Sequence, residues 1–300
     1  MSKPASNAIA ADNLAEFPQP DWYDETLHDE YRLSLRIDRV LHRARTEHQD
    51  LIIFENARFG RVLALDGAIQ TTEGDEYVYH EMLAHVPILA HGNAREVLII
   101  GGGDGGMLRE VLRHASTASA TLVEIDHAVI ETCREFLPNH SAGAFDDPRA
   151  EIVIADGAFF VAETERRFDV VIVDSTDPIG PGEALFSERF YAGCKRCLKP
   201  GGVLVTQNGV PAVQGEEVTD SHARLRRHFA DVAFYLAPVP TYSGGSMAFG
   251  WASDDKAPRS TPLKTLQARY AKAGIETRYY NPEIHEAAFA LPNDVRALMG

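Results

Sequence analysis

The fold is decided by the stretch Val97–Gly106, which reads VLIIGGGDGG. Its four leading apolar residues predict a buried strand, and the segment Met107–Arg113 that follows predicts a helix. Gly101, Gly103 and Gly106 fit the spacing G-x-G-x-x-G, in which glycines permit a tight turn and a close approach of the backbone to a ligand. The stretch therefore predicts the nucleoside-binding turn of an α/β domain.

Apolar runs and helical patterns alternate after this loop. We expect a helix at Val129–Phe136 and further strands at Thr121–Ile125, Glu151–Ala155, Phe168–Val173 and Gly202–Thr206. This alternation predicts a parallel sheet with helices on both faces.

The chain before the loop has a different pattern. Between Tyr31 and Gln70, short apolar runs are separated by turn residues, which predicts antiparallel strands. Gly74–His85 predicts a helix. The boundary between the β-rich part and the α/β part is expected near residues 75–95.

Composition excludes several classes of protein. The chain has 300 residues, with 29 Lys and Arg against 44 Asp and Glu, so its net charge is −15. Nucleic-acid binding needs a basic surface and is not expected. No apolar run is long enough to span a membrane, and the first 20 residues lack the apolar core of a secretory signal. With only three cysteines, two of them (Cys194 and Cys197) expected in one helix, we predict a cytoplasmic protein.

Two carboxylates indicate which ligand the glycine loop holds. Asp104 lies inside the loop, where it would repel a pyrophosphate but suits a positively charged group. This favours an adenosyl sulfonium over a dinucleotide. Glu124 lies 18 residues after Gly106 at the end of the next predicted strand, where a carboxylate can accept both ribose hydroxyls.

Carboxylates also follow the later strands. Because ligands of parallel sheets lie beyond the carboxyl ends of the strands, we expect these groups to converge: Asp104, Glu124, Asp156, Asp174 and Asp177. Any one of them could instead cap a helix. Their mutual repulsion would be relieved by a metal ion or a polyamine. No histidine accompanies Asp174 and Asp177, which disfavours the metal.

Aromatic residues complete this pattern. Tyr77, Tyr79 and His80 precede the glycine loop, and Tyr242 follows Pro240-Thr241. Aromatic rings beside carboxylates suit an alkylammonium chain, through packing of the methylenes and cation–π attraction, although core packing is the alternative for each ring.

With these motifs the sequence resembles the polyamine aminopropyltransferases, and bacterial spermidine synthases in particular. The resemblance begins near Trp22 and rests on ordered motifs, which include Leu65–Gln70, Asp75–Glu81, the glycine loop, Val123–Asp126, Asp174–Pro181 and Tyr279–Pro282. It implies a Rossmann-like (class I methyltransferase-like) catalytic domain over residues 81–300, an N-terminal β-strand domain over 21–80 and a flexible leader over 1–20.

The resemblance also implies a reaction. Decarboxylated S-adenosylmethionine, a co-substrate, donates its aminopropyl group to putrescine, which gives spermidine and methylthioadenosine. No cofactor and no metal are implied, and the enzyme is expected to be a homodimer or a homotetramer.

Roles for single residues follow from the resemblance alone. Asp174 is expected to accept the proton of the attacking amine. The donor is expected to contact Gln49, Asp104, Glu124, Asp156, Gly157 and Pro181. Putrescine is expected to contact Trp22, Gln70, Tyr79, His80, Asp177 and Tyr242.

One position departs from many members of the family. They have a glutamate two residues after the equivalent of Gln207, where this chain has Gly209. The choice of diamine is therefore open. Three other functions compete: a methyltransferase that uses ordinary S-adenosylmethionine, a dinucleotide-dependent dehydrogenase and a non-catalytic polyamine-binding protein.

Overall fold

The computed structural model describes residues 21–178 and 180–300, so the expected leader over 1–20 lies outside the described residues. The described residues divide into two compact units, the first ending at Gly74 and the second covering Asp75–Gly300. Within the described residues, no helix is long and apolar enough to cross a membrane.

The N-terminal unit is built from antiparallel strands, as predicted. β1 (Trp22–Asp24) pairs with β2 (Ser34–Arg36). A four-stranded sheet follows in chain order: β3 (Arg39–Arg45), β4 (Asp50–Asn56), β5 (Gly60–Leu65) and β6 (Ala68–Thr72). Asp66 and Gly67 both have positive φ in the β5–β6 turn, a geometry that joins two strands tightly.

The second unit contains a seven-stranded sheet in the order β12-β13-β11-β10-β7-β8-β9. Its parallel strands are β7 (Glu96–Gly101), β8 (Ser119–Glu124), β9 (Ala150–Ile154), β10 (Phe168–Asp174) and β11 (Leu198–Gln207). β12 (Asp231–Pro238) and β13 (Ser246–Ser253) add an antiparallel edge, which we did not predict from the sequence. The expected Rossmann-like α/β fold class is confirmed.

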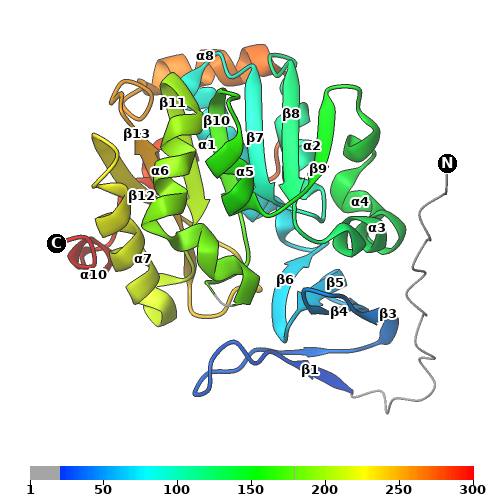
Figure 1. Ribbon diagram of the computed structural model, residues 1–300. Coiled ribbons are helices and arrows are strands. Elements are labelled where there is room, and N and C mark those ends of the chain that lie inside the picture. Colours follow the sequence, from blue (N-terminus) through cyan, green and yellow to red (C-terminus); the bar gives the residue numbers. More distant parts are fainter. Residues whose placement is uncertain (1–20, 179) are drawn as a thin grey trace. The chain divides into compact units, whose positions relative to one another are not determined.

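Helices cover both faces of this sheet (Figure 1). One face packs against α1 (Glu76–His91), α2 (Gly106–Leu112), α3 (His127–Phe136) and α8 (Leu263–Ala273). The other packs against α5 (Gly157–Glu163), α6 (Glu188–Cys197) and α7 (Pro211–Leu225). The remaining short helices are α4 (Pro138–Ser141), η2 (Ala144–Asp146), η3 (Gly180–Phe186), α9 (Pro282–Ala288) and α10 (Asn293–Ala297).

The strand order places a topological switch point beside β7. The chain runs from β7 through β8 to β9 on one side and then returns to β10 on the other side of β7. Gly101 at the end of β7 lies opposite Asp174 at the end of β10. Open α/β sheets bind ligands beyond the strand ends at such a point.

Candidate active site

The glycine loop packs against the end of β10. Gly102 N donates a hydrogen bond of 3.0 Å to the carbonyl oxygen of Asp174. Gly101 and Gly102 have φ of 84° and 72°, and a Cβ atom on Gly101 would lie 2.1 Å from the same carbonyl. A side chain at Gly101 would therefore push the loop away from Asp174.

Asp104 is held by the loop and by helix α1. Its Oδ1 accepts a hydrogen bond from Gly106 N at 2.6 Å, and its Oδ2 lies 3.6 Å from His80 Nε2. The other ring nitrogen, His80 Nδ1, lies 2.6 Å from Glu76 Oε2. A Cβ atom on Gly106 would lie 2.3 Å from the imidazole, so only glycine leaves space for this ring.

These contacts fix the charges of the pair. Burial opposes ionisation of His80, but Asp104 and Glu76 outweigh it and raise the pKa of His80 to about 10. Burial likewise opposes ionisation of Asp104, but the adjacent His80 charge lowers the pKa of Asp104 well below its usual value. At neutral pH, Asp104 is an anion beside a histidinium ion.

Asp174 has a different environment although it lies at the same switch point. Its Oδ1 accepts a hydrogen bond of 2.7 Å from the Tyr79 hydroxyl. Its Oδ2 is buried, and no described residue donates a hydrogen bond to it. Burial, with the nearby charge of Asp104, raises the pKa of Asp174 to about 6 against the opposing effects of His80 and Tyr79. Asp174 thus has a free oxygen that can accept a proton near neutral pH.

Glu124 ends β8 as expected. Its Oε1 accepts a hydrogen bond of 2.9 Å from Asp126 N, and a Cβ atom on Gly103 would lie 2.9 Å from its Oε2. Burial raises the pKa of Glu124 to about 7, although the hydrogen bond from Asp126 N opposes this shift. The carboxylate therefore lies directly against the glycine loop.

Asp156 and Gly157 lie at the start of α5. Asp156 Oδ1 caps this helix by accepting hydrogen bonds from Ala158 N at 2.7 Å and Phe159 N at 3.1 Å. The contacts of Asp156 in the structure are therefore those of a helix cap, which was the alternative to a role in ligand binding. Gly157 is required for packing, because a Cβ atom there would lie 2.4 Å from Ile100 Cγ2.

Tyr79 and Tyr242 are brought together by a buried anchor. Their rings meet edge to face with centroids 5.9 Å apart. Asp75 Oδ2 accepts hydrogen bonds from the backbone N and the hydroxyl of Thr241, each at 2.8 Å. The residue that precedes α1 therefore holds the loop that carries Tyr242.

Asp177 belongs to a cluster that sequence analysis missed. Gln214 Nε2 donates to Asp177 Oδ1 at 2.8 Å and to Glu217 Oε1 at 2.9 Å. Gln214 and Glu217 lie inside α7, several residues beyond the end of β11, and so neither is at the end of a strand. A Gln and a Glu three residues apart on one helix were the available signal, but such pairs are common on exposed helices.

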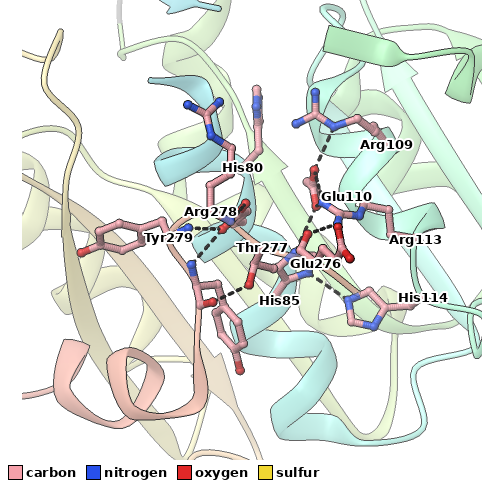
Figure 2. A network of polar contacts seen from close by, with 12 residues as sticks. His80, His85, Arg109, Glu110, Arg113, His114, Glu276, Thr277, Arg278 and Tyr279 are labelled. Carbon is pink, nitrogen blue, oxygen red and sulfur yellow. Dashed lines mark hydrogen bonds and ion pairs between the residues drawn. The ribbon is translucent and has the colours of Figure 1, made fainter. Parts of the chain in front are cut away.

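A second polar network continues from the carboxylates along α1 and α2 (Figure 2). Arg109 bridges Glu76 and Glu110 at 2.8 Å each, and Glu110 lies 3.0 Å from His85. Arg113 joins Glu110 to the carbonyl oxygen of Glu276. Figure 2 shows how this network connects the helices to the C-terminal segment.

Four predicted site residues belong to other parts of the chain. Trp22, Gln49 and Gln70 belong to the N-terminal unit, where Trp22 is 54% exposed and Gln70 Nε2 donates to Ala68 O at 3.3 Å. Pro181 lies in η3, and its side chain is outside the described part of the chain. Their roles stay predictions.

Comparison with known proteins identifies the family. Residues 76–262 match the family described as "Spermine/spermidine synthase domain", and residues 21–73 match "Spermidine synthase tetramerisation domain". The polyamine aminopropyltransferase 1 of Pseudomonas aeruginosa is 63% identical over 93% of this chain and 97% of its own length. The polyamine aminopropyltransferase of Shigella flexneri is 59% identical over 90% of this chain and 94% of its own length.

Solved structures of spermidine synthases support the same family. A spermidine synthase in complex with the transition-state analogue AdoDATO has a TM-score of 0.88 and 42% identity, covering 95% of this chain and 99% of its own. The spermidine synthase from Thermotoga maritima has a TM-score of 0.85 and 40% identity, covering 96% and 99%. The chain therefore belongs to the spermine/spermidine synthase family and is an aminopropyltransferase.

Proposed function

We propose that the enzyme transfers the aminopropyl group of decarboxylated S-adenosylmethionine to putrescine, giving spermidine and methylthioadenosine. The observation that carries this proposal is the environment of Asp174. It is a buried carboxylate at the switch point, Tyr79 holds one of its oxygens, and its other oxygen has no donor among the described residues.

The chemistry needs such a group. A putrescine amine has a pKa near that of lysine, about 10, and its ammonium form has no lone pair. Asp174 Oδ2 accepts the proton, and the free nitrogen attacks the aminopropyl carbon bonded to sulfur. The new C–N bond forms as the C–S bond breaks, and its electron pair returns to sulfur, so that neutral methylthioadenosine leaves. Alignment of the two substrates supplies much of the rate, and no cofactor takes part.

The donor is selected by charge and by its ribose. Glu124 accepts the ribose hydroxyls, and the Asp104 anion attracts the ammonium of the aminopropyl group. Ordinary S-adenosylmethionine carries a carboxylate beside that ammonium, and Asp104 would repel it. Because His80 contacts carboxylates through both ring nitrogens, we assign it to holding Asp104 rather than to contacting putrescine.

The expected assembly and location are also part of this proposal. The match of residues 21–73 to a tetramerisation domain supports a homo-oligomer, either a dimer or a tetramer. Sedimentation equilibrium would distinguish them as multiples of the 33.0 kDa chain. We place the enzyme in the cytoplasm.

The test compares two donors with putrescine as acceptor. Release of methylthioadenosine from decarboxylated S-adenosylmethionine, and not from S-adenosylmethionine, is the expected result. Turnover of S-adenosylmethionine alone, with S-adenosylhomocysteine as product, would make the chain a methyltransferase and overturn the assignment of Asp104.

A further inference from the structure

A glutamate on α7 occupies space that the backbone leaves open beside the proposed site. Gly209 has φ of +64°, and a Cβ atom there would lie 2.9 Å from Glu217 Oε2. Gly209 N donates to Gln207 Oε1 at 3.0 Å, and Gln207 Nε2 donates to the carbonyl oxygen of Thr176 at 3.0 Å. The Glu217 carboxylate is therefore packed against a segment tied to the end of β10.

The helix is distorted where it holds this carboxylate. Gln214 has non-helical φ and ψ of −129° and 35° inside α7. Its side-chain nitrogen donates to both Asp177 and Glu217, and its Oε1 accepts from Val210 N at 2.9 Å. Helix kinks have local causes, and here the kink coincides with an amide shared by two carboxylates.

Glu217 lacks a partner for its second oxygen. Oε2 is buried, no described residue donates a hydrogen bond to it, and no described Lys, Arg or His forms an ion pair with Glu217. Burial, with the charge of Asp177, raises the pKa of Glu217 to about 8. A buried carboxylate oxygen beside a second carboxylate is costly to leave unpaired, and a cationic donor would satisfy it.

The position of Asp177 connects this cluster to the reaction. Asp177 follows Asp174 by three residues and lies on the same strand-end loop. A diamine whose reacting nitrogen lies at Asp174 carries a second ammonium at the far end of its chain.

We infer that Glu217, together with Asp177, binds the remote ammonium group of the amine substrate and makes the enzyme select diamines over monoamines. This inference rests on the proposed function. Gln214 positions both carboxylates, and the free oxygen of Glu217 supplies the acceptor. Glu217 is thus a specificity-determining residue that lies outside the strand ends.

The experiment compares Glu217→Gln with a matched control. Glu216→Gln alters the adjacent residue of the same helix, which is exposed. Methylthioadenosine release is measured for wild type and both variants, with putrescine or n-butylamine as acceptor and decarboxylated S-adenosylmethionine as donor. The midpoint of thermal unfolding shows whether each variant folds; loss of a buried, like-charged carboxyl is not expected to lower it.

In Glu217→Gln we expect KM for putrescine to rise about tenfold or more, because the substrate ammonium loses a hydrogen bond to a charged group. The values of kcat, KM for the donor and kcat/KM for n-butylamine should stay within about twofold, and Glu216→Gln should match wild type. A merely structural role would move the donor KM and the n-butylamine rate as well.

Two results would overturn the inference in different ways. Suppose that the wild type is active and that Glu217→Gln leaves the putrescine KM unchanged or lowers the rates with both amines equally. This result refutes the role of Glu217 and leaves the proposed function intact. A wild type that releases no methylthioadenosine with either amine refutes the proposed function, and the inference fails with it.

Discussion

Asp104 and Asp174 are two buried carboxylates whose neighbours shift their pKa values in opposite directions. His80 keeps Asp104 ionised, whereas burial raises the pKa of Asp174 to about 6. Such a separation assigns different tasks to chemically identical groups. We assign Asp104 to permanent charge and Asp174 to proton transfer.

Asp174→Asn should lower turnover by a factor of about 10²–10⁴, because the amide cannot accept the proton of the amine. Methylthioadenosine should still bind, since the side chain keeps its shape. Single-turnover kinetics and calorimetry would measure the two effects, with Asp146→Asn, an exposed site, as control. Near-wild-type turnover would remove Asp174 from its assigned role.

The pair of His80 and Asp104 should give stability that depends on pH. Because folding raises the pKa of His80 from 6.5 to about 10, its contribution is complete below about pH 6.5 and is lost as the pH rises towards 10. The free energy of unfolding of wild type minus that of His80→Gln should therefore decrease across this window. Urea unfolding at several pH values measures it, and a constant difference would contradict the charged histidine.

At the scale of elements, α1 joins the site to the C-terminal segment. Tyr79 contacts Asp174, and His80 contacts Asp104. The next residue, Glu81, contacts the C-terminal segment instead. Glu81 Oε1 accepts from Arg278 N, and its Oε2 accepts from Tyr279 N and Tyr280 N, all at 2.8 Å. One buried helix thus holds both the two carboxylates of the proposed site and a distant loop.

Glu81→Gln should loosen that loop. The new NH₂ group would face backbone N–H donors and leave at least one of them buried without an acceptor, which costs about 1–3 kcal/mol. We expect a lower free energy of unfolding and faster amide exchange at residues 278–280. Glu286→Gln, an exposed change on α9, serves as control, and equal exchange in the two variants would contradict the anchor.

At the scale of the whole molecule, the net charge of −15 is opposite in sign to the charge of putrescine, the proposed acceptor. A negative protein attracts a dication over a distance limited by the Debye length, about 30 Å at 0.01 M salt and about 8 Å at 0.15 M. The acidic composition can therefore serve the encounter with the amine as well as solubility.

The value of kcat/KM for putrescine should fall as salt increases over this range at constant pH. The fall should be smaller for n-butylamine, which carries one charge instead of two. Steady-state rates of methylthioadenosine release measure both. Equal salt dependence for the two amines would limit the role of the net charge to solubility.

Sequence analysis predicted the central strands because continuous apolar runs, such as Val97–Ile100, are typical of strands buried on both faces. The same runs placed Glu124 and Asp174 at strand ends, and Asp104 in the glycine loop that follows the first of these strands. The antiparallel edge was missed although Val232–Ala237 in β12 is a continuous apolar run, because the direction in which β13 pairs with β11 depends on contacts between segments distant in sequence. Glu217 was missed because its contacts depend on a kink in α7 and on the packing of that helix.

The pairing of Gly101 with Asp174 has a consequence for how the enzyme gains activity during synthesis. The glycine loop leaves the ribosome before β10, yet Asp174, the proposed proton acceptor, reaches it only when β10 enters the sheet beside β7. Contacts between segments distant in sequence form slowly, because a long loop must close first. A nascent chain that ends before β10 would have the loop without Asp174. If Asp174 has the role proposed above, recovery of activity on refolding should follow completion of the central sheet.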